Sequence, residues 1–158
     1  MAETIGGYCL DKKVIKTPLH SRGGIEPCDV FVAPGTLVHV KRGRRSSDLS
    51  HLLAQGLVST DALSRDENAR IAWRKRIEEE SHGKLKDAEI KDVILAIGKD
   101  HPITVDSLFT FTKVNLVKQF DALRYLDVQV RVVTVIPPSP TPSQAAAGTQ
   151  EPFDSSTK

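Results

Sequence analysis

The hydrophobic and polar positions in the first part of the chain predict strands. The stretch "DVFVAPGTLVHVKR" carries β-branched and aromatic residues on both sides of a Pro-Gly pair. Extended runs on either side of a tight turn are typical of a hairpin, so residues 29–42 are predicted to pair as antiparallel strands. The looser alternation of "YCLDKKVI", residues 8–15, predicts an edge strand before the hairpin.

Helical spacing of the apolar residues begins immediately after the hairpin. Leucines recur at this spacing in "SSDLSHLLAQG", where Ser46 or Ser47 can cap the first turn and Gly56 is a natural stop. His51 and Gln55 lie four residues apart and therefore share one face of this helix. We interpret that face as plain polar surface; the alternative is that it looks toward a site.

The second half of the chain alternates between helical and extended patterns. These patterns predict a charged helix over 64–81, a buried strand "DVILAIG", a helix through "SLFTFTKVNLVKQFDALRYL" and a last strand "VQVRVVTVI". Six residues of the two strands are predicted to lie in the core: Ile94, Leu95, Ile97, Val130, Val132 and Val133.

The order of the predicted elements defines the fold class. Three strands, two helices, a strand, a helix and a strand indicate an α/β protein with a mixed sheet flanked by helices. Residues 1–136 are predicted to form one such domain. Residues 137–158, "PPSPTPSQAAAGTQEPFDSSTK", offer little to bury and are predicted to be a disordered tail.

Composition adds mainly exclusions. The chain of 158 residues holds 22 basic and 20 acidic residues, so its net charge of +2 does not by itself indicate a nucleic-acid or membrane partner. An apolar run long enough to cross a bilayer is absent from the sequence. Cys9 and Cys28 fit no metal-ligand spacing, and a secretory signal is not evident. We therefore expect a soluble, cytoplasmic protein with reduced thiols, and the oligomeric state stays open.

Candidate chemistry lies on the predicted hairpin. His39 and Lys41 are two residues apart and leave one face of their strand, while Val38 and Val40 point to the other. Asp29 lies on the neighbouring strand, where the turn can bring its carboxylate beside that face. A carboxylate and a lysine on adjacent strands can hold a divalent cation and stabilise charge that develops on a phosphate. Asp29, His39 and Lys41 are therefore the candidate catalytic residues.

A basic, hydroxyl-rich segment follows the candidate residues directly. It contains Arg42, Arg44 and Arg45, and Ser46 and Ser47 lie at a helix start, where free amides and the helix dipole favour a phosphate oxygen. These five residues are the candidate contacts to a nucleic-acid backbone. The alternative interpretation is a solvated turn, because clustered charges are often structural.

The stretch "IEPCDVFVAPGTLVHVKRG" resembles the core of the restriction-endonuclease-like superfamily, and "LVHVKR" resembles a strand of the Mrr-type nucleases. In that superfamily an aspartate begins one strand, and an acidic residue, any residue and a lysine end the next. The resemblance assigns these roles to Asp29 and Lys41, with His39 in the place of the acidic ligand. It implies a Mg²⁺ or Mn²⁺ ion held by Asp29, with Glu26, Asp11 or His39 completing the ligands, and imidazole favours manganese.

A second resemblance covers most of residues 8–136. The segments "LDKKVI", "EPCD", "HVKRG" and "SSDLSHLLAQGLVS" together resemble a family of sporadically distributed, uncharacterised bacterial proteins thought to lie near defence and mobile-element genes. The resemblance implies that those relatives are much longer, and we expect the chain to correspond to their C-terminal part. Two hypotheses result: a metal-dependent nuclease or nuclease remnant in a defence setting, or a non-catalytic module of the same fold that binds nucleic acid or protein.

Overall fold

The computed structural model describes residues 2–136, in which five strands form one sheet in the order β1-β2-β3-β4-β5. The strands are β1 (Tyr8–Cys9), β2 (Val30–Val32), β3 (Thr36–Arg42), β4 (Asp92–Gly98) and β5 (Gln129–Val135). The helices are a 3-10 turn, η1 (Glu3–Ile5), followed by α1 (Ser46–Arg65), α2 (Glu67–Glu80) and α3 (Thr110–Arg124). The predicted element order and mixed α/β class are confirmed.

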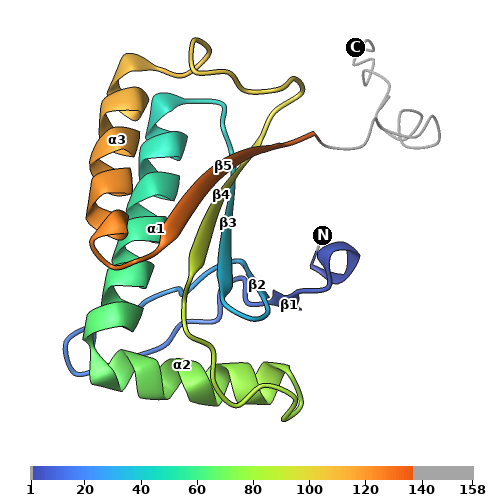
Figure 1. Cartoon of the computed structure of the whole chain (residues 1–158), viewed down its shortest axis with the longest axis vertical. Coiled ribbons are helices and arrows are strands. Elements are labelled where there is room, and N and C mark those ends of the chain that lie inside the picture. The colour runs from blue at the N-terminus through green and yellow to red at the C-terminus, as the bar shows by residue number, and fades with distance from the viewer. Residues whose placement is uncertain (1, 137–158) are drawn as a thin grey trace, which may run out of the picture.

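The sheet is antiparallel on one side and parallel on the other. β1, β2 and β3 pair antiparallel, with Val30 opposite Val38, which confirms the predicted hairpin. β3, β4 and β5 run parallel. α1 and α2 connect β3 to β4, and α3 connects β4 to β5. Figure 1 shows α1 and α3 on one face of the sheet, with α2 across one end of the molecule.

The main core lies between the sheet and its helices. Leu37 of β3 and Val93 and Leu95 of β4 project into a cluster that also contains the leucines of α1. Trp73 of α2 packs edge-on against Phe31 of β2, with ring centroids 5.2 Å apart. These contacts fix α1 against β3 and β4, which positions the end of β3 where the candidate residues lie.

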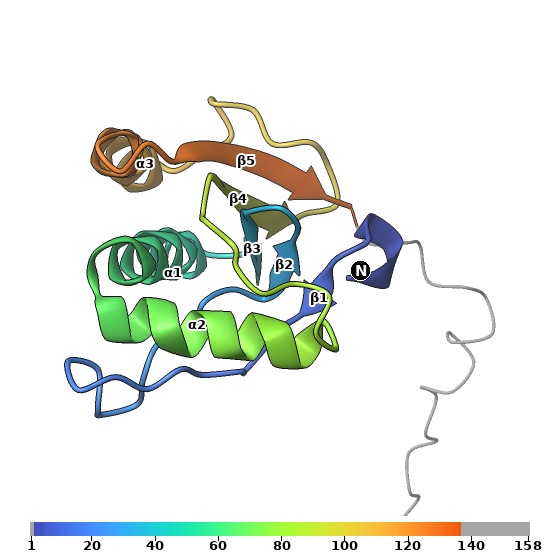
Figure 2. The same cartoon turned by 60° about the horizontal axis from the view of Figure 1, so that its bottom comes forward.

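The opposite face of the sheet carries apolar residues without helical cover. Val30, Val38 and Ala96 are buried there, with partly buried neighbours such as Val40 and Ile94. Within residues 2–136 only η1 approaches this face, as Figures 1 and 2 show. Two of the six predicted core residues, Ile94 and Val133, lie on this face and are consequently not fully buried. Val132 is also only partly buried, but it packs against the main core from the edge strand β5. A strand buried on both faces requires helices on both faces, and the described residues supply them on one.

Element boundaries differ from the predicted ones where local signals were weak. The strand predicted over 8–15 is reduced to β1, and Ile15 contributes only an isolated bridge to Ile25. The Asp48 carboxylate accepts the Arg45 backbone N–H at 3.0 Å, so Asp48 rather than Ser46 or Ser47 satisfies the start of α1. α2 and α3 begin three or more residues later than predicted, and Asp66 caps α2 by accepting from the Asn68 N–H at 2.9 Å.

The largest boundary difference concerns Gly56, which lies inside α1 rather than at its end. A side chain at this position would place its Cβ 3.0 Å from Leu95 Cδ2. The glycine therefore permits close approach of α1 to β4, and the helix continues for nine further residues to Arg65. This extension covers part of β3.

The two faces of the sheet are buried to different extents. Truncation of neighbouring residues in β4 is therefore expected to lower the free energy of unfolding by different amounts. Leu95 is 1% exposed in the main core, so Leu95→Ala is expected to lower the free energy of unfolding by about 3 kcal/mol. Ile94 is only partly buried on the uncovered face, so Ile94→Ala is expected to cost about 1 kcal/mol, because its cavity opens to solvent. Urea unfolding of both variants measures the difference. Equal losses of unfolding free energy in the two variants would contradict the assignment of Ile94 to an uncovered face.

Residues 137–158, predicted as a tail, lie outside the described residues. Among the described helices, none combines the length and apolar character needed to cross a membrane.

Candidate metal centre at the edge of strand β3

The candidate site begins where β2 stops pairing with β3. The Asp29 N–H donates to Val38 O at 3.0 Å, which extends the ladder one residue before β2. The next free amide of the β3 edge, Val40 N–H, donates to the Asp29 carboxylate at 2.5 Å (Oδ2). Asp29 therefore replaces a missing strand partner, and its second carboxylate oxygen makes no such ladder contact.

Asp11 and Glu26 reach Asp29 from two other segments. The Leu10 N–H donates to Asp29 O at 2.8 Å, which brings the following Asp11 alongside. The Glu26 carboxylate accepts from the Lys12 N–H at 2.6 Å and from the Gln55 side-chain amide at 3.2 Å. Glu26 precedes Pro27, which cannot donate to a ladder, and the chain bends there instead of continuing as a strand.

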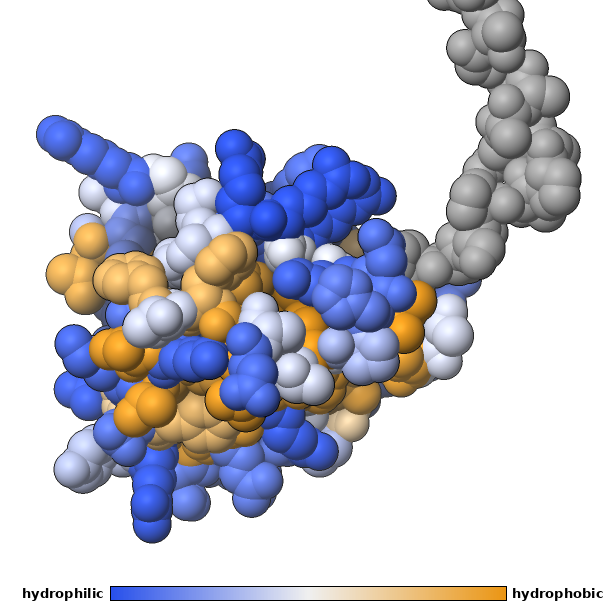
Figure 3. Space-filling view, turned by 90° about the horizontal axis from the view of Figure 1, so that it is seen from above, coloured by the Kyte–Doolittle hydropathy of each residue, from blue (hydrophilic) through white to orange (hydrophobic). Residues whose placement is uncertain are grey.

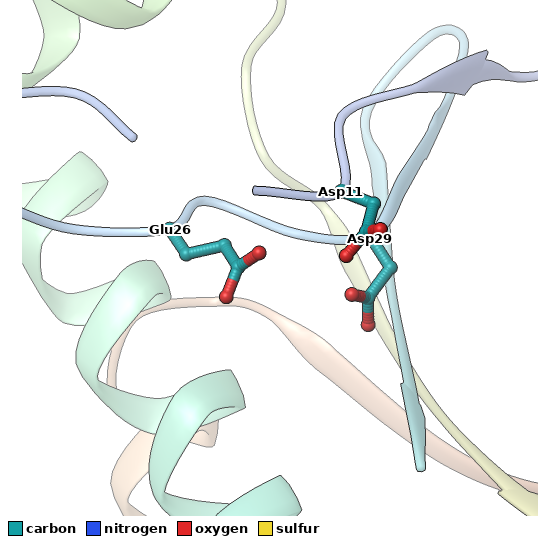
Figure 4. A group of neighbouring side chains, drawn as sticks. All are labelled: Asp11, Glu26 and Asp29. Atoms are coloured by element: carbon teal, nitrogen blue, oxygen red, sulfur yellow. The ribbon is translucent and has the colours of Figure 1, made fainter. Parts of the chain in front are cut away.

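The three carboxylates converge on one point. Asp11, Glu26 and Asp29 each offer an oxygen, and these oxygens all lie within 4.8 Å of one another. Figure 4 shows the three side chains gathered in one region. Asp11 is exposed and the other two are partly buried. Carboxylate oxygens are the ligands preferred by hard divalent cations, so the group can bind Mg²⁺ or Mn²⁺.

The electrostatics of the group favour a cation. Burial raises the pKa of Asp29, and the Glu26 and Asp11 carboxylates raise this pKa further. The hydrogen bond from Val40 N–H and the positive charge of Lys41 act in the opposite direction, but the pKa stays above its ordinary value. A divalent cation would relieve the repulsion among the three carboxylates.

His39 is not brought to the carboxylates. Its side chain is 1% exposed and lies beneath α1, where Nε2 is 3.2 Å from the Ser59 hydroxyl. Burial lowers the pKa of His39 to about 4, so the ring is neutral at neutral pH. Within the described residues the candidate metal-binding group contains oxygen ligands alone: Asp29 is joined by both Glu26 and Asp11, the two carboxylates predicted as alternatives to His39. The preference for manganese that an imidazole would confer therefore has no structural basis.

The predicted basic residues separate into two groups. Lys41, Arg42 and Arg44 line a cavity at the end of β3. Arg45, Ser46 and Ser47 begin α1 outside that cavity: Arg45 is exposed beside Asp48, and the Ser46 carbonyl accepts from Ser50 in the first turn.

Four residues of the site region were not among the predicted site residues. Gln55 contacts Glu26, and His51 lines the same small hollow beside it, so the polar face of α1 looks toward the site rather than only toward solvent. Lys99 and His101 line the basic cavity from the connection after β4. The parallel crossover rule is the signal for this pair, because it places the ends of β3 and β4 at one edge.

Fold and site together define a mixed α/β protein with a carboxylate-lined candidate metal centre at the edge of its sheet. A model for a protein family of unknown function, DUF6119, matches residues 1–136, and the chain belongs to that family. Neither the curated proteins nor the solved structures include a match to the chain. The family agrees with the resemblance to uncharacterised proteins, while the restriction-endonuclease-like core stays a prediction.

Proposed function

We propose that the protein is a metal-dependent phosphodiesterase that acts on nucleic acid, with a restriction-endonuclease-like core. The supporting observation is that oxygens of Asp11, Glu26 and Asp29 lie within 4.8 Å of one another. The positive charge of Lys41 also acts to lower the pKa of Asp29. The resemblance of the hairpin to Mrr-type nucleases and the proposed setting in bacterial defence are consistent with this activity.

Each of these residues would have a separate role in phosphodiester hydrolysis. Asp11, Glu26 and Asp29 would hold the divalent cation, which would polarise a phosphate oxygen and lower the pKa of a water molecule. Lys41 would stabilise the negative charge that develops on the phosphate as water attacks phosphorus and the bridging oxygen leaves. Gln55 and the Lys12 N–H orient Glu26 through hydrogen bonds and are positioning groups.

A non-catalytic module that binds nucleic acid or protein is the second candidate function. The observation that favours it is that two carboxylates already serve the fold. Asp29 satisfies the Val40 amide, and Glu26 accepts from Lys12 and Gln55. The bond to Val40 would be needed without any metal, because an amide that is partly buried on a strand edge requires a partner.

Calorimetric titration with Mn²⁺ tests whether the carboxylates form a metal site. Parent protein is expected to bind one ion, and Asp29→Asn is expected to weaken this binding at least about 10-fold, because one charged ligand is lost. The amide oxygen can still accept from Val40 N–H, so the fold should persist. Asp121→Asn removes an exposed carboxylate from α3 and should bind as the parent does. Equal affinity in Asp29→Asn and parent would refute the site.

A further inference from the structure

A basic cavity lies at the carboxyl ends of the parallel strands. Its volume is about 950 Å³, and its two walls are the connections that follow β3 and β4. Figure 3 looks onto this end of the molecule and shows strongly hydrophilic side chains beside hydrophobic ones. Open α/β sheets bind ligands at the carboxyl ends of their strands, where successive connections diverge.

The cavity has a fixed frame. The Gly43 N–H donates to Gly98 O at 3.2 Å, and the Lys99 N–H donates to Val135 O at 3.1 Å, so the strand ends remain joined beyond the strands themselves. A Cβ at Gly43 would lie 2.5 Å from Ile97 Cγ2, which shows how closely the first wall packs on β4. The walls are held in place before any ligand arrives, which lowers the entropic cost of binding.

The chemistry of the cavity is amphipathic. Positive charge comes from four residues, with the ring of His101 beside them: Lys41, Arg42, Arg44 and Lys99. Asp100 is the one acidic residue in its lining. Val40 and Val135 add apolar surface that continues into the uncovered face of the sheet. A matching ligand carries negative charges next to a flat apolar group.

We infer that this cavity binds a single-stranded segment of nucleic acid, with an unpaired base on the valine surface and the flanking phosphates on the basic walls. Arg42, Arg44 and Lys99 contact phosphates, and the base lies against Val40 and Val135 beside the His101 ring. The inference rests on the proposed function for the nature of the ligand, and Lys41 is common to the cavity and the candidate metal centre.

The apolar surface distinguishes single strands from duplexes. In a duplex the base faces are stacked inside, so only phosphates and groove edges could reach Val40 or Val135. Unpaired bases present their faces, which can lie against Val40 and Val135 and stack on an aromatic ring such as that of His101. Phosphate contacts alone would bind both forms through charge and would not prefer single strands.

Fluorescence anisotropy with labelled DNA of about 12 nucleotides, as a single strand and as a duplex, tests the inference. Titrations in EDTA at several salt concentrations keep binding separate from cleavage. The parent is expected to prefer the single strand at least about 10-fold, because base stacking adds to charge. Replacing Arg42 and Lys99 together by alanine should weaken both forms and lower the salt slope by about 0.7 per lost contact on the single strand.

The valine surface has its own variant and control. Val40→Thr keeps size and charge, and it is expected to weaken single-strand binding at least about threefold while duplex binding is unchanged. Val32→Thr alters the same uncovered face outside the cavity and should bind as the parent does. Circular dichroism melting identifies any variant that fails to fold. Absent binding, equal affinity for both forms, or unchanged single-strand affinity in a folded Val40→Thr would overturn the inference.

The two proposals fail in distinguishable ways. If the protein prefers single strands in EDTA but cleaves nothing with any metal, the inference is upheld and the proposed phosphodiesterase activity is refuted. Metal-dependent cleavage without single-strand preference upholds the phosphodiesterase and removes the inference.

Discussion

Lys41→Met is expected to slow metal-dependent cleavage by about 10²- to 10³-fold, the cost of removing one preorganised charge-stabilising group. Lys41 directly follows Val40, whose N–H donates to the Asp29 carboxylate at 2.5 Å, and its positive charge opposes the rise in the pKa of Asp29. Methionine retains most of the side-chain stem, so the partly buried strand position should stay filled. Single-turnover cleavage of labelled DNA and RNA at saturating Mg²⁺ or Mn²⁺ measures the loss.

Metal affinity separates this role from that of the ligands. Mn²⁺ binding by Lys41→Met should equal or exceed that of the parent, because a nearby positive charge is removed. Lys118→Met removes an exposed lysine from α3 and serves as the matched control. Parent-like cleavage by a folded Lys41→Met variant would show that Lys41 takes no part in the chemistry.

The largest pH effect on stability is expected from His39. The ordinary pKa of a histidine side chain is 6.5, and burial lowers the pKa of His39 to about 4 in the folded protein because it disfavours the charged ring. A depressed histidine pKa means that the unfolded chain binds the proton first as pH falls. Stability is therefore full above 6.5 and is lost progressively toward pH 4, by about 3 kcal/mol in total.

His39→Gln isolates this contribution from that of the carboxylates. The amide can still hydrogen bond with the Ser59 hydroxyl, but it does not titrate. Urea unfolding between about pH 7 and pH 4 should show a steeper loss in the parent than in His39→Gln. His51→Gln replaces an exposed histidine of α1 and should follow the parent. Parallel curves for parent and His39→Gln would mean that His39 is not buried as a neutral ring.

The burial of His39 could not be predicted from the sequence. The strand period correctly groups Leu37, His39 and Lys41 on one face, because strand geometry is local. Whether that face is open or covered depends on the length of α1. Gly56 is a helix stop by propensity, but close packing on Leu95 makes it part of the helix, and the extension places Ser59 over His39. Tertiary contact overrides the local signal.

The grouping of the three carboxylates could be predicted from the sequence only in part. Strand parity alone points Glu26 away from Asp29, and the bend at Pro27 is the signal that allows its return. Asp11 follows a strand that is much shorter than the alternation predicts, and its position depends on the Leu10 bond to Asp29 O. The ladder contacts between distant segments bring the oxygens together, and a single sequence does not specify their register.

The most direct test of the proposed phosphodiesterase is the cleavage rate as a function of Mn²⁺ concentration, measured for the parent and Asp29→Asn with labelled DNA and RNA. We expect the parent rate to rise from zero in EDTA and to reach half its maximum near the Kd obtained by calorimetry. A folded Asp29→Asn variant is expected to show no metal-dependent rate. A rate in Asp29→Asn equal to that of the parent, or no cleavage by the parent with either metal, would contradict the proposed phosphodiesterase.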